Sequence, residues 1–131
     1  MKKHMVRNAC MALLTVFVFG SCATALQKEI AAADFGTLPS SYETDIKNLM
    51  SHRLKDPHSA VYTFYPARKG VGQDGLLLGG KKHYGYIVPV DIYAKNIYGG
   101  GGTEKFYFLF TPNGRFLDCT SALGQMVTFV E

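Results

Sequence analysis

A short apolar segment near the beginning of the chain limits how much of it can belong to a folded domain. Residues 9–20 (ACMALLTVFVFG) carry no charge, and Lys2, Lys3 and Arg7 precede them. As a helix, these 12 residues would span only about 18 Å, whereas the hydrocarbon core of a bilayer is about 30 Å thick. The length and the basic flank are typical of a secretory signal peptide. We therefore expect the chain to be exported and its first residues to be removed.

Two cleavage sites compete at the end of this segment. Phe19-Gly20-Ser21-Cys22 resembles the lipobox of bacterial lipoproteins, which implies diacylglycerol on the Cys22 sulfur and cleavage before this residue. Ala23-Thr24-Ala25 fits the small-residue pattern of an ordinary signal-peptidase site, which would leave a soluble periplasmic or secreted protein. Cysteine usage favours lipidation, because Cys10 leaves with the signal and Cys119 then remains as a lone thiol. A Cys22–Cys119 disulfide is the alternative, and it requires an uncleaved or differently cleaved start.

Lipidation at Cys22 divides the chain into three regions. We expect a signal peptide at residues 1–21, a lipidated tether at residues 22–38 and a single domain at residues 39–131. Ala23 after the cysteine, in place of Asp, resembles lipoproteins sent to the outer membrane, so we expect an outer-membrane anchor with the domain facing the periplasm. The whole chain has a formal net charge of +4, but the signal peptide removes three basic residues and no acidic one. The mature chain then carries only +1, which together with export argues against a nucleic-acid partner.

The mature part of the chain predicts one helix followed by strands. Ser40 and Glu43 fit a capping box, and Pro57 is expected to end the helix. Between them, apolar residues recur at helical spacing and form one stripe: Tyr42, Ile46, Leu49, Met50 and Leu54. Aromatic and β-branched runs predict strands at residues 61–65, 85–96, 105–111, 115–119 and 126–130. We therefore predict an α+β domain, with one N-terminal amphipathic helix packed on an antiparallel meander of four or five strands.

A proline and a glycine-rich segment interrupt the predicted strands. Pro89 has no N–H, so its strand is expected at a sheet edge or with a bulge. Residues 69–85 are glycine-rich and are expected to form a mobile loop. Within this loop, residues 70–75 (GVGQDG) match a dinucleotide-binding fingerprint, and residues 75–82 nearly match a P-loop. Neither is followed by a helix whose N-terminus could receive phosphates, so we expect no nucleotide.

Catalytic and metal-binding patterns are absent from the sequence. The mature histidines, His52, His58 and His83, do not have metal-ligand spacing, and no pair of carboxylates specifies hydrolase chemistry. Cys119 could act as a nucleophile beside one of these histidines, which keeps a small thiol hydrolase as the alternative function. However, Cys119 lies at the end of a predicted strand and not at a helix N-terminus that would lower its pKa. We expect a protein that is not an enzyme and holds no cofactor and no metal.

Two segments together resemble a family of small exported bacterial proteins, many of which carry lipoprotein signals. Leu54–Ala60 (LKDPHSA) resembles the LKDP-x-SA helix exit of that family, and Ala94–Gly100 (AKNIYGG) resembles its AKN-x-[YF]-GG segment. The resemblance covers about residues 40–118, and it implies export and a compact fold but no activity and no catalytic residue. The four consecutive glycines at 99–102 depart from the family, in which an aromatic residue often interrupts them.

Basic and aromatic residues beside the glycines are the candidates for binding. Lys95, Asn96 and Tyr98 lie at the turn of a predicted hairpin, where they could present a recognition surface. Lys81 and Lys82 flank the glycine-rich loop and could meet phosphates or carboxylates of the envelope. We therefore expect a lipid-anchored, non-enzymatic binding or assembly module, with a membrane contact through its lipid and an envelope protein or cell-wall component as partner.

Overall fold

The computed structural model describes residues 27–75, 79–120 and 126–130. The chain divides into two compact units, residues 1–33 and Asp34–Glu131. In the first unit, residues 27–32 form a short helix, whereas the predicted signal peptide, Cys22 and both predicted cleavage sites lie outside the described residues. The second unit contains every other described helix and strand.

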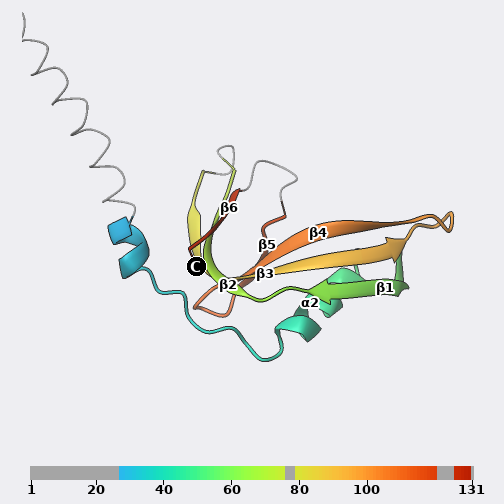
Figure 1. Ribbon diagram of the computed structural model, residues 1–131, viewed down its shortest axis with the longest axis horizontal. Coiled ribbons are helices and arrows are strands. Elements are labelled where there is room, and N and C mark those ends of the chain that lie inside the picture. The colour runs from blue at the N-terminus through green and yellow to red at the C-terminus, as the bar shows by residue number, and fades with distance from the viewer. Residues whose placement is uncertain (1–26, 76–78, 121–125, 131) are drawn as a thin grey trace, which may run out of the picture. The chain divides into compact units, whose positions relative to one another are not determined.

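The second unit is an antiparallel sheet with one helix, α2 (Tyr42–Ser51). Its described strands are β1 (Asp56–Phe64), β2 (Arg68–Gln73), β3 (Lys82–Lys95), β4 (Gly101–Phe110), β5 (Phe116–Asp118) and β6 (Met126–Phe129). They follow the order β5-β4-β3-β2-β6, and β1 pairs with β3 next to β2. Figure 1 shows β3 and β4 as a long arm with β1 along one border.

The predicted α+β class is wrong, because this unit is mostly β-sheet. Its helix has 10 residues, whereas six strands pair in the part of the chain that the structure describes. The order is also not a meander, since β1 and β2 both pair with β3, and β6 pairs with β2. The prediction failed because it assigned residues 69–85 to a mobile loop, although they contain most of β2 and the beginning of β3.

Glycines in the segment 69–85 serve close packing between strands. Gly70 and Gly72 lie two positions apart in β2, so both point to the same face of the sheet. A Cβ atom on Gly70 would collide with Cδ1 of Ile87, and one on Gly72 would lie 2.8 Å from Sγ of Cys119. The glycine spacing that suggests a phosphate-binding loop is therefore the spacing of one crowded strand face.

Pro89 lies in the central strand β3, so of the two predicted alternatives, a sheet edge or a bulge, the edge is wrong. β1 and β2 pair one after the other with the same edge of β3, and residues 65–67 pass between them. Pro89 lies opposite this irregular passage, where its carbonyl oxygen accepts the N–H of Tyr65 at 3.0 Å. A proline fits a central strand here because its missing N–H faces the point where one neighbouring strand ends and the next begins.

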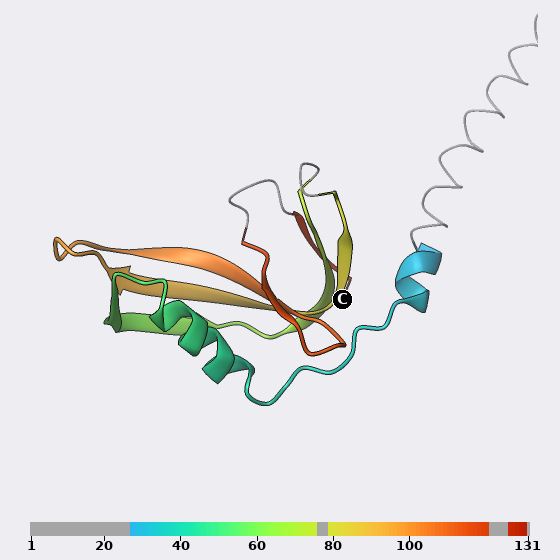
Figure 2. The ribbon, with the colours of Figure 1, turned by 180° about the vertical axis from the view of Figure 1, so that it is seen from behind.

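Two hydrophobic clusters lie on opposite faces of the sheet. The larger one includes the buried side chains of α2 and of the strands beneath it: Ile46, Met50, Val88, Val90, Ile92, Phe108 and Phe110. Figure 2 shows α2 on this face. The smaller cluster has Ile87, Leu109 and Cys119 at its centre. Since successive residues of a strand point to opposite faces, β3 and β4 contribute to both clusters and are held from both sides.

The helix α2 is shorter than predicted. Its N-cap residue is Ser41 rather than Ser40, and no side chain caps the backbone there. The carboxylate of Glu43 instead lies 3.8 Å from the ammonium of Lys47, so the predicted capping box is wrong. The helix also ends before the predicted stop at Pro57, which belongs to β1.

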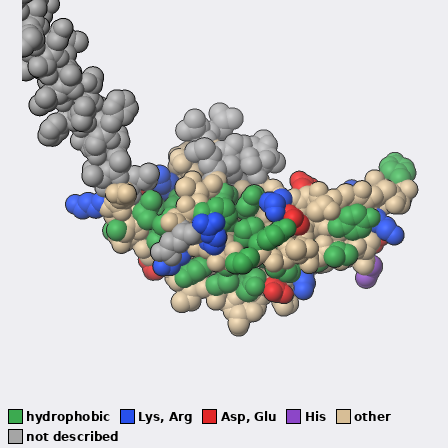
Figure 3. All heavy atoms as spheres, viewed as in Figure 1, with side chains coloured by type: hydrophobic (Ala, Val, Ile, Leu, Met, Phe, Trp, Pro, Cys, Tyr) green, Lys and Arg blue, Asp and Glu red, His purple; other side chains and the backbone are tan. Residues whose placement is uncertain are grey.

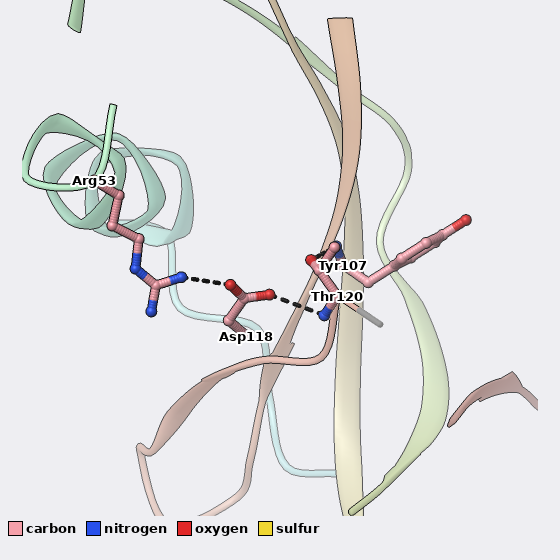
Figure 4. Close-up of polar contacts among 4 residues, drawn as sticks. All are labelled: Arg53, Tyr107, Asp118 and Thr120. Carbon is pink, nitrogen blue, oxygen red and sulfur yellow. Dashed lines mark hydrogen bonds and ion pairs between the residues drawn. The ribbon is translucent and has the colours of Figure 1, made fainter. Parts of the chain in front are cut away.

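A polar network fixes the end of α2 to the sheet. Arg53, just after the helix, donates from Nη1 to Oδ2 of Asp118 at the end of β5 (Figure 4). Oδ1 of Asp118 accepts the N–H of Thr120 at 2.9 Å, and Oγ1 of Thr120 accepts the N–H of Tyr107 at 3.0 Å. Because Leu54 directly follows Arg53, the network also positions the segment that leads from α2 into β1.

Candidate functional site

The predicted binding residues occupy opposite ends of β3. Lys82 is the first residue of β3 and Lys81 precedes it, whereas Lys95 is the last residue and Asn96 follows it. A straight strand of 14 residues would span roughly 45 Å, at about 3.4 Å per residue, and Figure 1 shows that β3 bends between its two ends. The structure therefore brings Lys95, Asn96 and Tyr98 together, but it places Lys81 and Lys82 at a separate location.

The turn between β3 and β4 holds two hydrophobic side chains in solvent on a hydrogen-bonded backbone. Oδ1 of Asn96 accepts the N–H groups of Tyr98 and Gly100, both at 3.0 Å. The backbone of Asn96 also donates to the carbonyl of Gly100 at 2.6 Å and accepts the N–H of Gly99 at 3.1 Å. Gly99 has a φ of 81°, a conformation that favours glycine. This turn leaves the side chains of Ile97 and Tyr98 exposed, at 70% and 89%.

An exposed hydrophobic pair at the end of a projecting hairpin is suited to recognition. Figure 3 shows hydrophobic side chains at the far end of the arm, separated from the hydrophobic side chains over the rest of the sheet. Tyrosine supplies a large contact area and a hydroxyl, and it is enriched where proteins bind one another. A turn whose backbone is already ordered also loses little conformational freedom on binding.

A groove adjoins this turn on the sheet face that carries α2. Its volume is about 260 Å³. The groove has an apolar lining from Leu54, Ile92, Ala94 and Phe106, and its charged lining residues are Arg53, Lys55, Lys95 and Glu104. Within the described part of the chain, Lys55 and Lys95 form no ion pair. The groove can therefore accept an apolar group that has a negative charge beside it.

The two motif segments of the sequence, residues 54–60 and 94–100, meet at this groove. Oγ of Ser59 donates to the carbonyl oxygen of Asp56 at 2.8 Å and accepts the N–H of Lys95 at 2.9 Å. These bonds bridge the point where the register of β1 against β3 shifts. Ser59 and Asp56 thus have a structural role, whereas the side chains of Lys55 and Lys95 stay at the surface.

The other end of β3 borders a cleft of mixed charge. Two adjoining cavities of about 310 and 320 Å³ share four residues, Lys81, His83, Arg115 and Leu117. Three carboxylates also line them, from Asp34, Asp74 and Asp118. Nε2 of His83 lies 3.1 Å from Oδ2 of Asp74. Because the carboxylates offset the cations, the cleft does not select an anion by its charge, and binding by Lys81 and Lys82 stays a prediction.

Cys119 lies at the border of this cleft, and its side chain is a buried, free thiol that is 6% exposed. Burial raises the pKa of this thiol to about 11, and the negative charges of Asp118 and Asp74 contribute to the increase. His83 lines the same cavity, but no hydrogen bond joins it to Cys119 among the described residues. This geometry does not favour the thiol hydrolase, because a nucleophilic cysteine needs a lowered pKa and access.

We expect Cys119 to react slowly with iodoacetamide in the folded protein. A pKa raised from 9.0 to about 11 lowers the thiolate fraction about 100-fold near neutral pH, and burial slows access further. Above pH 9 the unfolded state loses the thiol proton first, so this group makes the free energy of unfolding fall as the pH rises towards 11. Mass spectrometry of the Cys119 peptide, labelled at pH 8 with and without urea, measures the labelling rates of the unfolded and the folded protein. Equal rates would contradict the burial of this thiol.

Some residues of this site were not identified from the sequence. Ile97 is more exposed than any other large aliphatic side chain in the described part of the chain, whereas the sequence pattern predicts a role only for its neighbours Asn96 and Tyr98. The available signal was its place between Asn96 and four glycines, where a tight hairpin turn cannot bury it. The apolar lining of the groove gave no signal, because Leu54 and Phe106 come from distant segments and also fit an ordinary core.

Comparison with known proteins finds no matching family model, no matching curated protein and no matching solved structure. None of the helices that the structure describes is both long enough and apolar enough to span a membrane. The described residues also contain no group of three or more His, Cys, Asp or Glu side chains that could hold a metal ion. The function is therefore inferred from the geometry of the β3–β4 hairpin and its groove.

Proposed function

We propose that this chain is a lipid-anchored binding module of the cell envelope, with the β3–β4 hairpin as its recognition element. The observation that carries the proposal is the hydrogen-bonded turn that holds Ile97 and Tyr98 in solvent. The sequence of the first 22 residues supports export and a lipid on Cys22. Lipid anchoring at the outer membrane would raise the local concentration of the domain near its partner. A small binding surface would then be sufficient for binding.

The groove indicates the chemistry of the partner. Part of its lining is apolar, and beside Glu104 it carries the ammonium groups of Lys55 and Lys95, which form no ion pair in the described part of the chain. A segment of an envelope protein with an apolar side chain beside a carboxylate fits this combination. A cell-wall peptide, which also carries carboxylates, is the other candidate. The proposed activity is binding without chemical conversion.

We expect a photo-crosslinking residue at position 98 to capture the partner in cells. The full-length chain carries p-benzoylphenylalanine in place of Tyr98, and a second chain carries it in place of Asn113 as the control. Asn113 is also exposed, but it lies in the turn between β4 and β5, away from the hairpin. Irradiation should give an adduct at position 98 and none at position 113. The same adduct from both positions, or none from position 98, contradicts the proposal.

Matched variants then measure how much the turn contributes. Ile97→Ala combined with Tyr98→Ala should weaken binding of the captured partner at least about 10-fold, as exposed anchor residues do at interfaces. The free energy of unfolding should change by less than about 0.5 kcal/mol, because both side chains are exposed. Asn96→Ala keeps both side chains but removes the acceptor that orders the turn, so it should also weaken binding. Unchanged binding in the double variant would show that recognition occurs elsewhere.

A further inference from the structure

The outer edge of β1 is open in the described part of the chain. β1 pairs with β3 only, and Figures 1 and 2 show it at the border of the arm. The N–H of Tyr65 donates to Pro89 of β3, and the residues of an antiparallel strand alternate between its two edges. Thr63 therefore directs its backbone groups to β3, whereas Tyr62 and Phe64 direct theirs outward. No hydrogen bond among the described residues uses these outward groups.

Pro57 and a register shift lie before residue 61 and Pro66 follows Tyr65, but residues 61–64 between them lack the features that usually prevent strand pairing. Residues 61–64 (VYTF) carry no charge, and the register shift of β1 lies before them. On one face Val61 is 61% exposed. On the other face the rings of Tyr62 and Phe64 stack at 6.1 Å between centroids. The opposite border of the arm differs, because β4 places Glu104 and Lys105 beside its outer edge. Of these two borders, β1 is thus the one that is open to an additional strand.

We propose that β1 pairs antiparallel with β1 of a second copy of this chain, with the two-fold axis at Thr63. In this register Tyr62 faces Phe64 of the second copy, Val61 faces Tyr65, and Thr63 faces its own equivalent. Aromatic pairs, aromatic–aliphatic pairs and threonine pairs are the combinations that stabilise neighbouring antiparallel strands. A second copy is the proposed partner because the same uncharged segment supplies both members of each of these pairs.

The charges around β1 permit this pairing. On the open face, Asp91 already pairs with Lys105 at 2.7 Å and accepts the hydroxyl of Tyr65 at 2.7 Å. On the helix face, the ammonium of Lys47 lies 5.3 Å from the ring centroid of Phe64 and pairs with Glu43. The proposed register therefore brings no unpaired like charges into direct opposition. It forms about four backbone hydrogen bonds, so we expect a weak dimer that forms at high protein concentration or when the chains are confined together.

Disulfide trapping tests both the pairing and its register. Directly opposite residues that do not exchange hydrogen bonds have Cα atoms about 4.5 Å apart, which is within the range of a disulfide. In the full-length chain under mild oxidation, Thr63→Cys should give a covalent homodimer. Val61→Cys should not, because its equivalent lies about four residues away along the partner strand. Thr103→Cys, an exposed threonine in β4 at the other border of the arm, should also stay monomeric.

A charge variant tests the same pairing without a new thiol. Thr63 lies beside Asp91 in the sheet, so Thr63→Lys is compatible with the monomer. In the dimer it places two ammonium groups opposite each other, and sedimentation velocity over a concentration series should show loss of the dimer.

Three outcomes overturn the proposal. The first is that cysteines at positions 61, 63 and 103 form homodimers to the same extent. The second is that the cysteine at position 63 forms no homodimer although maleimide labels its thiol. The third is that the cysteine at position 63 forms a disulfide with a different protein. None of these readouts depends on the turn at Tyr98, so failure of the hairpin proposal and failure of this one are distinguishable.

Discussion

Gly85→Ala should lower the free energy of unfolding by about 3 kcal/mol or more, which for a chain of this size is a large part of its total stability. A Cβ atom on Gly85 would overlap the carbonyl oxygen of Phe110 and lie 2.8 Å from the carbonyl carbon. Both atoms belong to the backbone of β4, so the collision cannot be relieved by rotating a side chain. Urea unfolding of the variant and of the natural protein, followed by circular dichroism, measures the difference.

Gly102→Ala is the matched control for this prediction. Gly102 is also a strand glycine, but a Cβ atom there would have nothing within 4 Å. Alanine at this position should leave the stability unchanged or raise it by up to about 1 kcal/mol, because it restricts the unfolded chain. A small effect at both glycines would mean that β3 and β4 do not approach as closely as the structure shows.

Cys22→Ala should move the protein from the membrane fraction to the soluble fraction almost completely. Each buried methylene of an acyl chain contributes about 0.8 kcal/mol of membrane affinity, so losing two or more chains removes roughly 20 kcal/mol. Fractionation of cells, with intact-mass measurement of the mature protein, checks the result. Cys10→Ala is the control, because that cysteine leaves with the predicted signal peptide and its loss should change neither location nor mature mass.

Two results would contradict lipidation at Cys22. One is a Cys22→Ala protein that stays in the membrane fraction with unchanged mass. The other is a natural protein whose mature form begins at Leu26, as cleavage after Ala25 predicts. The second result would leave the β3–β4 hairpin as a candidate recognition element of a soluble periplasmic or secreted protein.

Local patterns predicted the parts of the fold that local physics controls. The apolar stripe of α2 and the alternation of Val88, Val90 and Ile92 are visible in sequence because each repeats at the period of its element. Gly70 and Gly72 misled the prediction because a glycine is equally suited to a mobile loop and to a crowded strand. Only the facing side chains, Ile87 and Cys119, distinguish these cases, and they come from other segments. The α+β class failed for this reason.

The candidate site, too, could be predicted from the sequence only in part. Lys95, Asn96 and Tyr98 could be predicted at a hairpin turn, because Asn followed by glycines is a local turn signal. The groove could not be predicted, since it forms only when the end of α2 and the strands β3 and β4 come together. Lys81 and Lys82 looked equivalent to Lys95 in sequence, and the length of β3 separates them.

The place where the chain joins the second unit determines what a tethered domain can reach. The ring of Phe35 lies edge-on to that of Tyr84, with centroids 5.9 Å apart, so the tether meets the sheet near the Lys82 end of β3. Tyr98 lies beyond the other end, roughly 45 Å of extended strand away. Residues 22–33 add at most about 40 Å by covalent geometry. A lipid on Cys22 would therefore be joined to the sheet near the Lys82 end of β3 and not near Tyr98, so the turn could contact a partner that does not share the anchoring membrane.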